Sequence, residues 1–136
     1  MEKPLSGKRI LIVEDEVVFR SLLDNFLSSL GAQISLADDG VQALEHLQRS
    51  TPDMMICDLA MPHMDGLTLV GQLRSKGQTL PSLVIAATEN MSDIAKVLRL
   101  GVQDGLLKPV KDLARLREVV FECLYPSMFS SKVEED

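Results

Sequence analysis

The chain has 136 residues, 46% hydrophobic and 25% charged, which is an ordinary globular balance and enough for one domain with a core. Its net charge of −6 argues against binding nucleic acid through the phosphates. No apolar run approaches the roughly 20 residues that span a bilayer, and the N-terminal segment MEKPLSGKR lacks the apolar stretch of a secretory signal. We therefore expect a cytoplasmic domain that binds neither nucleic acid nor membrane. Cys57 and Cys123 lie in apolar segments without metal or redox spacing and are predicted to be buried thiols.

Short β-rich runs alternate with helical patterns along the chain. We expect five strands, at Arg9–Val13, Ala32–Ala37 (an edge strand), Met54–Cys57, Ser82–Ala87 and Gly105–Leu107. A helix should follow each strand: the first on the apolar stripe from Phe19 to Leu30, the second capped by Asp38 or Asp39, the third capped by Asp65, the fourth closed by Gly101 and the fifth from Leu113 to Leu124. Strict alternation of this kind predicts an α/β fold: a parallel sheet with helices on both faces.

Acidic side chains and one lysine follow the apolar strands, at the point where each strand ends. Glu14 and Asp15 follow the first strand, Asp58 the third and Lys108 the fifth. Ligands of open parallel sheets bind beyond the carboxyl ends of the strands, so we expect one shared site. Each of these residues alone also fits a plain role as a helix cap or loop residue. As a group they would repel one another, because two carboxylates about 4 Å apart repel by roughly 4 kcal/mol at an effective dielectric near 20. Either protons or a divalent cation would relieve this repulsion.

Oxygen ligands with open positions favour Mg²⁺, which also binds phosphate oxygens. This chemistry predicts Asp58 as a nucleophile that forms an acyl phosphate, with Lys108 neutralising charge on the transferring group.

The segments LIVEDE, ICDLAMPHMDG and LLKP resemble the motifs of response regulator receiver domains, and the similarity covers Lys8 to about Leu124. The resemblance implies a doubly wound, flavodoxin-like sheet of five strands in the order 2-1-3-4-5. It implies the following site: Glu14 and Asp15 as the acid pair, Asp58 as phosphoacceptor, Lys108 as phosphate partner, Mg²⁺ as cofactor with the Ala60 carbonyl as a further ligand, and a cis peptide bond before Pro109. It also implies a phosphodonor, either a sensor histidine kinase or a small molecule, and a signalling module without turnover of an external substrate.

A finer resemblance runs nearly end to end, through FRSLLD, ATENM, LRLGV and LLKPVKDLARLREVVFECLYPSMF. It is to the receivers of adaptors that recognise the stress sigma factor sigma-S and deliver it to the ClpXP protease. It implies a further C-terminal domain resembling a metal-dependent phosphatase, and anti-adaptor proteins as antagonists. We expect a receiver at residues 1–124 and the start of a linker helix at 125–136, because Pro126 suits a first helical turn and Ser131 followed by Glu134 is a capping-box pattern. A frayed terminus is the alternative interpretation of the tail.

Two positions depart from the receiver pattern. Ala86 stands where receivers usually have a serine or threonine, and Gly105 where they often have an aromatic switch residue. Thr88 is predicted to replace the missing hydroxyl only in part as a phosphate ligand. A docking module that works without phosphorylation therefore stays open as an alternative. A phosphatase-like enzyme with an aspartyl nucleophile is disfavoured, because Ala60 supplies no second acid.

The fourth and fifth helices carry more apolar residues than one inward stripe needs. We predict a docking face for a partner domain or a second copy of the chain, made of Val97, Leu100, Val119, Phe121, Tyr125 and Phe129. The alternative is a wide stripe shielded by the stems of Arg99 and Arg117.

Overall fold

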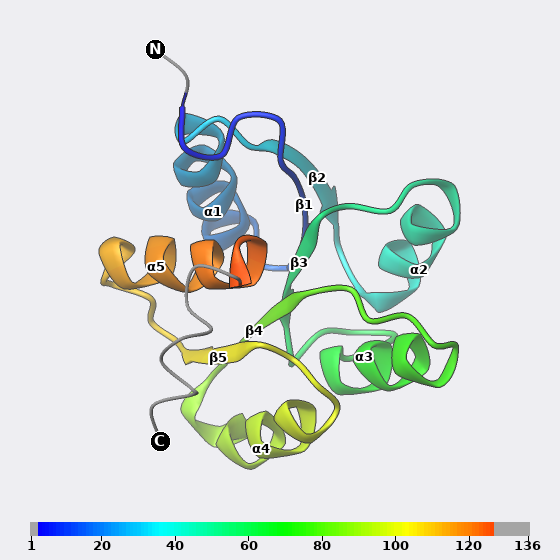
Figure 1. The fold of residues 1–136 in the computed structure, drawn as a ribbon. Helices are drawn as coiled ribbons and strands as arrows, with labels where there is room; N and C mark the ends of the chain where they lie inside the picture. Colours follow the sequence, from blue (N-terminus) through cyan, green and yellow to red (C-terminus); the bar gives the residue numbers. More distant parts are fainter. Residues whose placement is uncertain (1–2, 127–136) are drawn as a thin grey trace, which may run out of the picture.

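The structure is a computed structural model that describes residues 3–126 (Figure 1). Its sheet is parallel, in the order β2-β1-β3-β4-β5, which confirms the predicted fold. The strands are β1 (Arg9–Val13), β2 (Gln33–Ala37), β3 (Met54–Asp58), β4 (Ser82–Ala86) and β5 (Asp104–Leu107).

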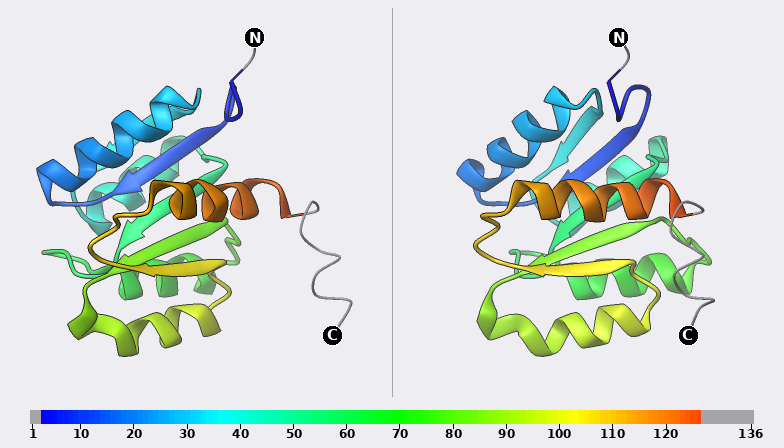
Figure 2. Two further views of the ribbon diagram at one scale, coloured as in Figure 1. Left: turned by 90° about the vertical axis from the view of Figure 1, so that its left-hand side faces the viewer. Right: turned by 60° about the vertical axis from the view of Figure 1, so that its left-hand side comes forward.

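Helices cover both faces of the sheet (Figures 1 and 2). The bounds are α1 (Val17–Ser29), α2 (Gly40–Arg49), α3 (Gly66–Ser75), α4 (Met91–Arg99) and α5 (Leu113–Leu124), with a short 3-10 helix η1 (Thr88–Asn90) before α4. The side chains of α1 and α5 pack into one buried cluster, and those of α2, α3 and α4 pack into the other. No helix between residues 3 and 126 has both the length and the apolar character needed to cross a bilayer.

The central strands are almost entirely apolar because both of their faces are buried, and Ser82 of β4 and Asp58 of β3 are their buried polar residues. In β1, Ile10 and Ile12 belong to the cluster under α1 and α5, whereas Leu11 and Val13 belong to the cluster under α2, α3 and α4. The edge strand β2 is more exposed, as its weaker apolar pattern predicted.

Aspartate side chains begin three of the helices. The carboxylates of Asp39, Asp65 and Asp112 accept hydrogen bonds from backbone N–H groups in the first turns of α2, α3 and α5. Both cysteines are free and buried, as predicted, and burial raises the pKa of the Cys123 thiol to about 12.

The prediction that Val97 and Val119 lie on an exposed docking face is wrong, because both side chains are fully buried. In α4 the inward side chains are Ile94 and Val97, three residues apart, and Leu98 is the exposed one at 43%. In α5 the inward stripe is formed by Leu116, Val119, Val120 and Cys123. The spacing i, i+3, i+4, i+7 places Val119 inside, on the same side of the helix as Leu116.

The other residues of that predicted face are half-buried or lie outside the described residues. Leu100 and Phe121 pack against the two core clusters. The Tyr125 ring packs edge-on against Phe121, 6.0 Å between centroids, and its hydroxyl donates to the Pro4 carbonyl at 3.3 Å. Tyr125 therefore joins the end of α5 to the N-terminal segment. Phe129 falls outside residues 3–126, as does most of the predicted linker helix.

Candidate functional site

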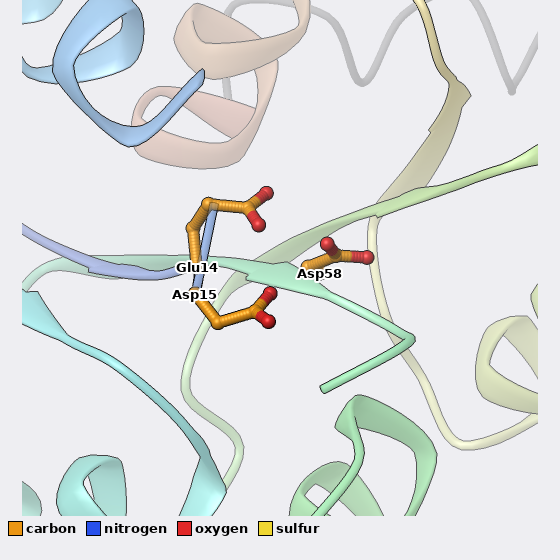
Figure 3. Close-up of side chains that lie close together, drawn as sticks. All are labelled: Glu14, Asp15 and Asp58. Carbon is orange, nitrogen blue, oxygen red and sulfur yellow. The ribbon is translucent and has the colours of Figure 1, made fainter. Parts of the chain in front are cut away.

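Three carboxyl groups meet at the ends of β1 and β3, which are neighbours in the sheet. Val13 pairs with Cys57, so Glu14 and Asp15 follow β1 beside Asp58 at the end of β3. One carboxylate oxygen from each of the three residues lies within 4.8 Å of the other two. Figure 3 shows the side chains of Glu14 and Asp15 reaching from the end of β1 towards Asp58. The predicted acidic residues are thus brought together at one point.

The three groups differ in their exposure to solvent. Glu14 is 2% exposed and Asp58 is 4% exposed, whereas Asp15 is on the surface. Burial, together with its hydrogen bond to Asp58, raises the pKa of the Glu14 carboxyl to about 7. The Glu16 backbone N–H donates to Glu14 Oε2 at 3.1 Å, which fixes the position of the Glu14 carboxyl group after β1.

Asp58 is held by groups from three directions. Lys108 Nζ donates to its Oδ2 at 2.7 Å, and the Ala60 backbone N–H donates to its Oδ1 at 3.1 Å. The start of α3 lies close behind, because a Cβ atom at Gly66 would sit 2.4 Å from the Asp58 carbonyl oxygen. The loop carrying Ala60 thus begins at Asp58 and returns to it at Gly66. The Lys108–Pro109 peptide bond, next to the lysine, is cis, as the resemblance implied.

Lys108 reaches Asp58 from the end of β5, two strands away. Its Nζ also lies 3.2 Å from Glu14 Oε1, 3.9 Å from Glu16 Oε2 and 5.0 Å from the centre of the Phe19 ring. Burial alone lowers the pKa of Lys108, but its contacts with Asp58 and Glu14 outweigh this, and the net shift is upwards. The lysine therefore stays charged at the centre of the acidic cluster.

The two positions that depart from the receiver pattern are both packed. Ala86 is fully buried at the end of β4, where its carbonyl accepts the Lys108 backbone N–H at 2.8 Å. Gly105 in β5 has no room for a side chain, because a Cβ atom there would lie 2.9 Å from Ile94 Cγ2. Thr88 is exposed at the start of η1, and its role as a phosphate ligand stays a prediction.

The loop between β3 and α3 is joined to α2 by a pair that the sequence did not indicate. His63 Nδ1 lies 2.8 Å from Asp39 Oδ2, and His63 adopts a left-handed backbone with φ of 66°. Next to this pair, the Gly40 N–H donates to the Met64 carbonyl at 3.2 Å. These contacts fix the segment that follows Asp58.

The comparisons with known proteins agree with this arrangement. The family model described as the response regulator receiver domain matches residues 10–121. The chain belongs to the response regulator receiver family. A curated relative, the "Regulator of RpoS" of Escherichia coli K12, is 68% identical to this chain over all 136 residues. The chain spans 40% of the length of that relative.

Solved structures show the same fold. The receiver matches a response regulator receiver protein from Pseudomonas putida with a TM-score of 0.79 and 33% identity, covering 85% of this chain and 96% of that one. The receiver domain of NtrX from Brucella abortus matches with a TM-score of 0.79 and 29% identity, covering 85% and 97% of the two chains.

The donor set fits a hard divalent cation. Three carboxyl groups converge, Asp15 is exposed to solvent, and burial raises the pKa of the Glu14 carboxyl to about 7, so a bound cation would favour its ionised form. Glu14, Asp15 and Asp58 are the residues that could hold Mg²⁺. The Ala60 carbonyl stays a predicted fourth ligand.

Sequence reasoning missed the parts that hold this site in place. Gly66 was visible within the motif, but its close approach to Asp58 requires the fold. The contacts of Phe19 with Lys108 and of His63 with Asp39 join residues far apart in the chain, and no spacing pattern indicates them.

Proposed function

We propose that this receiver is a phosphoacceptor signalling domain, phosphorylated on Asp58 with the help of Mg²⁺. The observation that supports it best is the 2.7 Å contact between Lys108 Nζ and Asp58 Oδ2 beside two further carboxylates. A lysine and a cation site around one carboxylate suit the transfer of an anionic group to that carboxylate. The domain would modify itself and turn over no external substrate.

In the proposed reaction, an ionised Asp58 oxygen forms a bond to the phosphorus of the donor. The bond from phosphorus to the donor's leaving group breaks, and the leaving group departs with the electron pair. Bound Mg²⁺ would supply charge neutralisation at the phosphoryl oxygens. Lys108 would move its ammonium from the free carboxylate to a phosphoryl oxygen, since it already lies at the reacting atom. Water later attacks the phosphorus, the bond between phosphorus and the Asp58 oxygen breaks, and inorganic phosphate leaves the regenerated carboxylate.

The test is the intact mass of the protein after treatment with acetyl phosphate and Mg²⁺. We expect the mass of one phosphoryl group on the wild type and none on Asp58→Ala. A phosphorylated Asp58→Ala variant, or an unmodified wild type, would contradict the proposal. Asp53→Ala is the control, because Asp53 lies at the opposite end of the sheet, where its Oδ2 accepts the Arg9 backbone N–H at 2.7 Å.

We propose that, in a longer protein, the receiver controls an adaptor that delivers sigma-S to the ClpXP protease. Anti-adaptor proteins would be its antagonists, and a sensor histidine kinase or a small phosphodonor would supply the phosphoryl group. The support is the 68% identity to relatives named "Regulator of RpoS", since RpoS is the sigma factor sigma-S. Comparing sigma-S binding by the full-length protein with and without phosphorylation, using Asp58→Ala as control, tests this role. Equal binding in all samples would rule out phosphorylation control.

A docking module that works without phosphorylation is the second candidate, favoured by the packing at Ala86 and Gly105. The buried Ala86 methyl offers no hydroxyl to a phosphoryl group, and Ile94 leaves no room for a side chain at position 105. This candidate predicts that sigma-S binding by the full-length protein is the same before and after phosphorylation of Asp58.

A further inference from the structure

Phe19 lies in the first turn of α1, and its ring faces the lysine of the site. The Lys108 ammonium is 5.0 Å from the ring centre, a distance at which the negative face of an aromatic ring attracts a cation. Phe19 is half-buried, and it lines a hollow of about 420 Å³ together with Lys108 and Leu22. The ring thus contacts the charged end of Lys108 from the side of α1.

This neighbour differs in kind from the other partners of Lys108. Asp58 and Glu14 are also the residues that could hold a metal, so a bound cation would compete with the lysine for their oxygens. Glu16 is 3.9 Å away and exposed, which makes it a weak anchor. A ring offers no oxygen to a metal and takes no N–H of the ammonium away from a phosphoryl oxygen.

We propose that Phe19 is a positioning residue, whose ring keeps the Lys108 ammonium over Asp58 when its carboxylate partners are engaged by the metal and by the incoming phosphoryl group. The proposal rests on the proposed function, since it concerns the same phosphotransfer. Phe19 itself touches no reacting atom.

A purely structural role would also account for a half-buried phenylalanine, and the chain offers a matched control for it. Phe26 lies two turns further along α1, is half-buried too, and packs against the same core cluster as Phe19. Phe26→Leu therefore removes a ring from the same helix and cluster, and it leaves the Phe19–Lys108 contact in place.

The experiment measures the rate constant of phosphorylation by acetyl phosphate at saturating Mg²⁺, by intact mass. Full-length wild type, Phe19→Leu, Phe19→Trp and Phe26→Leu are compared, and Phe19→Leu is repeated in a Lys108→Ala background. We expect Phe19→Leu to lower the rate constant by about three- to ten-fold, because that is the size of effect a partly desolvated cation–π contact supports. Phe19→Trp should restore it to within about two-fold of wild type, and Phe26→Leu should leave it unchanged.

A second measurement reads the contact without any phosphodonor. The Hε resonances of Lys108 in wild type should be displaced by the ring current of Phe19, and they should lose this displacement in Phe19→Leu but not in Phe26→Leu. Mg²⁺ affinity should be equal in all variants that retain Lys108, because Phe19 touches none of the candidate ligands.

The outcomes separate the two proposals. Equal losses in Phe19→Leu and Phe26→Leu, or a further loss from Phe19→Leu when Lys108 is absent, would overturn the positioning role and leave the phosphoacceptor function intact. Wild type that gains no phosphoryl group would overturn the phosphoacceptor function, and with it the role of Phe19. Loss in Phe19→Leu with rescue in Phe19→Trp and no effect without Lys108 would establish the positioning role.

Discussion

Glu14→Gln should change how the stability of the metal-free protein depends on pH. Glu14 is 2% exposed, and burial together with its hydrogen bond to Asp58 raises the pKa of its carboxyl from the usual 4.5 to about 7. A raised pKa means that the folded state binds the proton more tightly than the unfolded state. The resulting stabilisation is complete below pH 4.5 and is lost as the pH rises through about 7.

The size of the stability change follows from the rise of the Glu14 pKa from 4.5 to about 7. At 1.36 kcal/mol per pKa unit, this rise corresponds to about 3 kcal/mol, a large part of the free energy of unfolding of a domain of this size. Glutamine has nearly the same shape and binds no proton in this range. We therefore expect the free energy of unfolding of wild type, relative to Glu14→Gln, to fall by up to about 3 kcal/mol between pH 4.5 and 8.

Urea unfolding of both proteins at a series of pH values, in the presence of a chelator, measures this difference. Glu16→Gln is the control, because Glu16 lies two residues away and is exposed. It should follow wild type at every pH. Adding Mg²⁺ at pH 8 should stabilise wild type more than Glu14→Gln, since the cation replaces the lost proton. Parallel pH curves for wild type and Glu14→Gln would refute the reasoning.

Three further substitutions test the site. Asp15→Asn should weaken Mg²⁺ binding severely by removing a carboxylate from the cluster, and unchanged affinity in a calorimetric titration would contradict the assignment. Ala86→Ser should strengthen the coupling between phosphorylation and η1 by one partly charge-assisted hydrogen bond, typically about 1–3 kcal/mol, and identical beryllofluoride-induced amide shifts in η1 in both proteins would speak against it. Gly66→Ala should destabilise the fold by about 1–3 kcal/mol in urea unfolding, because its Cβ would meet the Asp58 carbonyl oxygen at 2.4 Å. A neutral Gly71→Ala, at a position with open space around the Cβ, is its control.

The sheet and its acidic edge could be predicted because both follow from local rules. A strand buried on both faces is a nearly continuous apolar run, and the residue that follows each strand reaches the same edge of a parallel sheet. Glu14, Asp15, Asp58 and Lys108 are therefore visible as a group before their distances are known. The strand order was available only from the family resemblance.

The docking face could not be predicted in this way, because it depends on the rotation of each helix about its axis. An apolar pair such as Val97 and Leu98 fits an inward stripe in either of two rotations. The packing of α4 against β4 and β5 selects the rotation that buries Val97 and exposes Leu98. In α5, packing likewise selects the rotation that buries Val119. A charged residue in place of either buried valine would disturb folding and could not test docking. Leu98, at 43% exposure, is therefore the better position for a charge substitution on this surface.

The packing at Gly105 limits how a phosphoryl group on Asp58 could be sensed by α4. Receivers usually have a hydroxyl side chain at the position of Ala86 and often an aromatic switch residue at the position of Gly105. Here the first position is the buried methyl of Ala86, and Ile94 from α4 already fills the space beside Gly105. What still joins Asp58 to β5 is Lys108, whose side chain contacts the aspartate and whose backbone N–H bonds the Ala86 carbonyl. We therefore expect a shift of the Lys108 backbone at the end of β5 to be one route by which α4 responds to phosphorylation of Asp58.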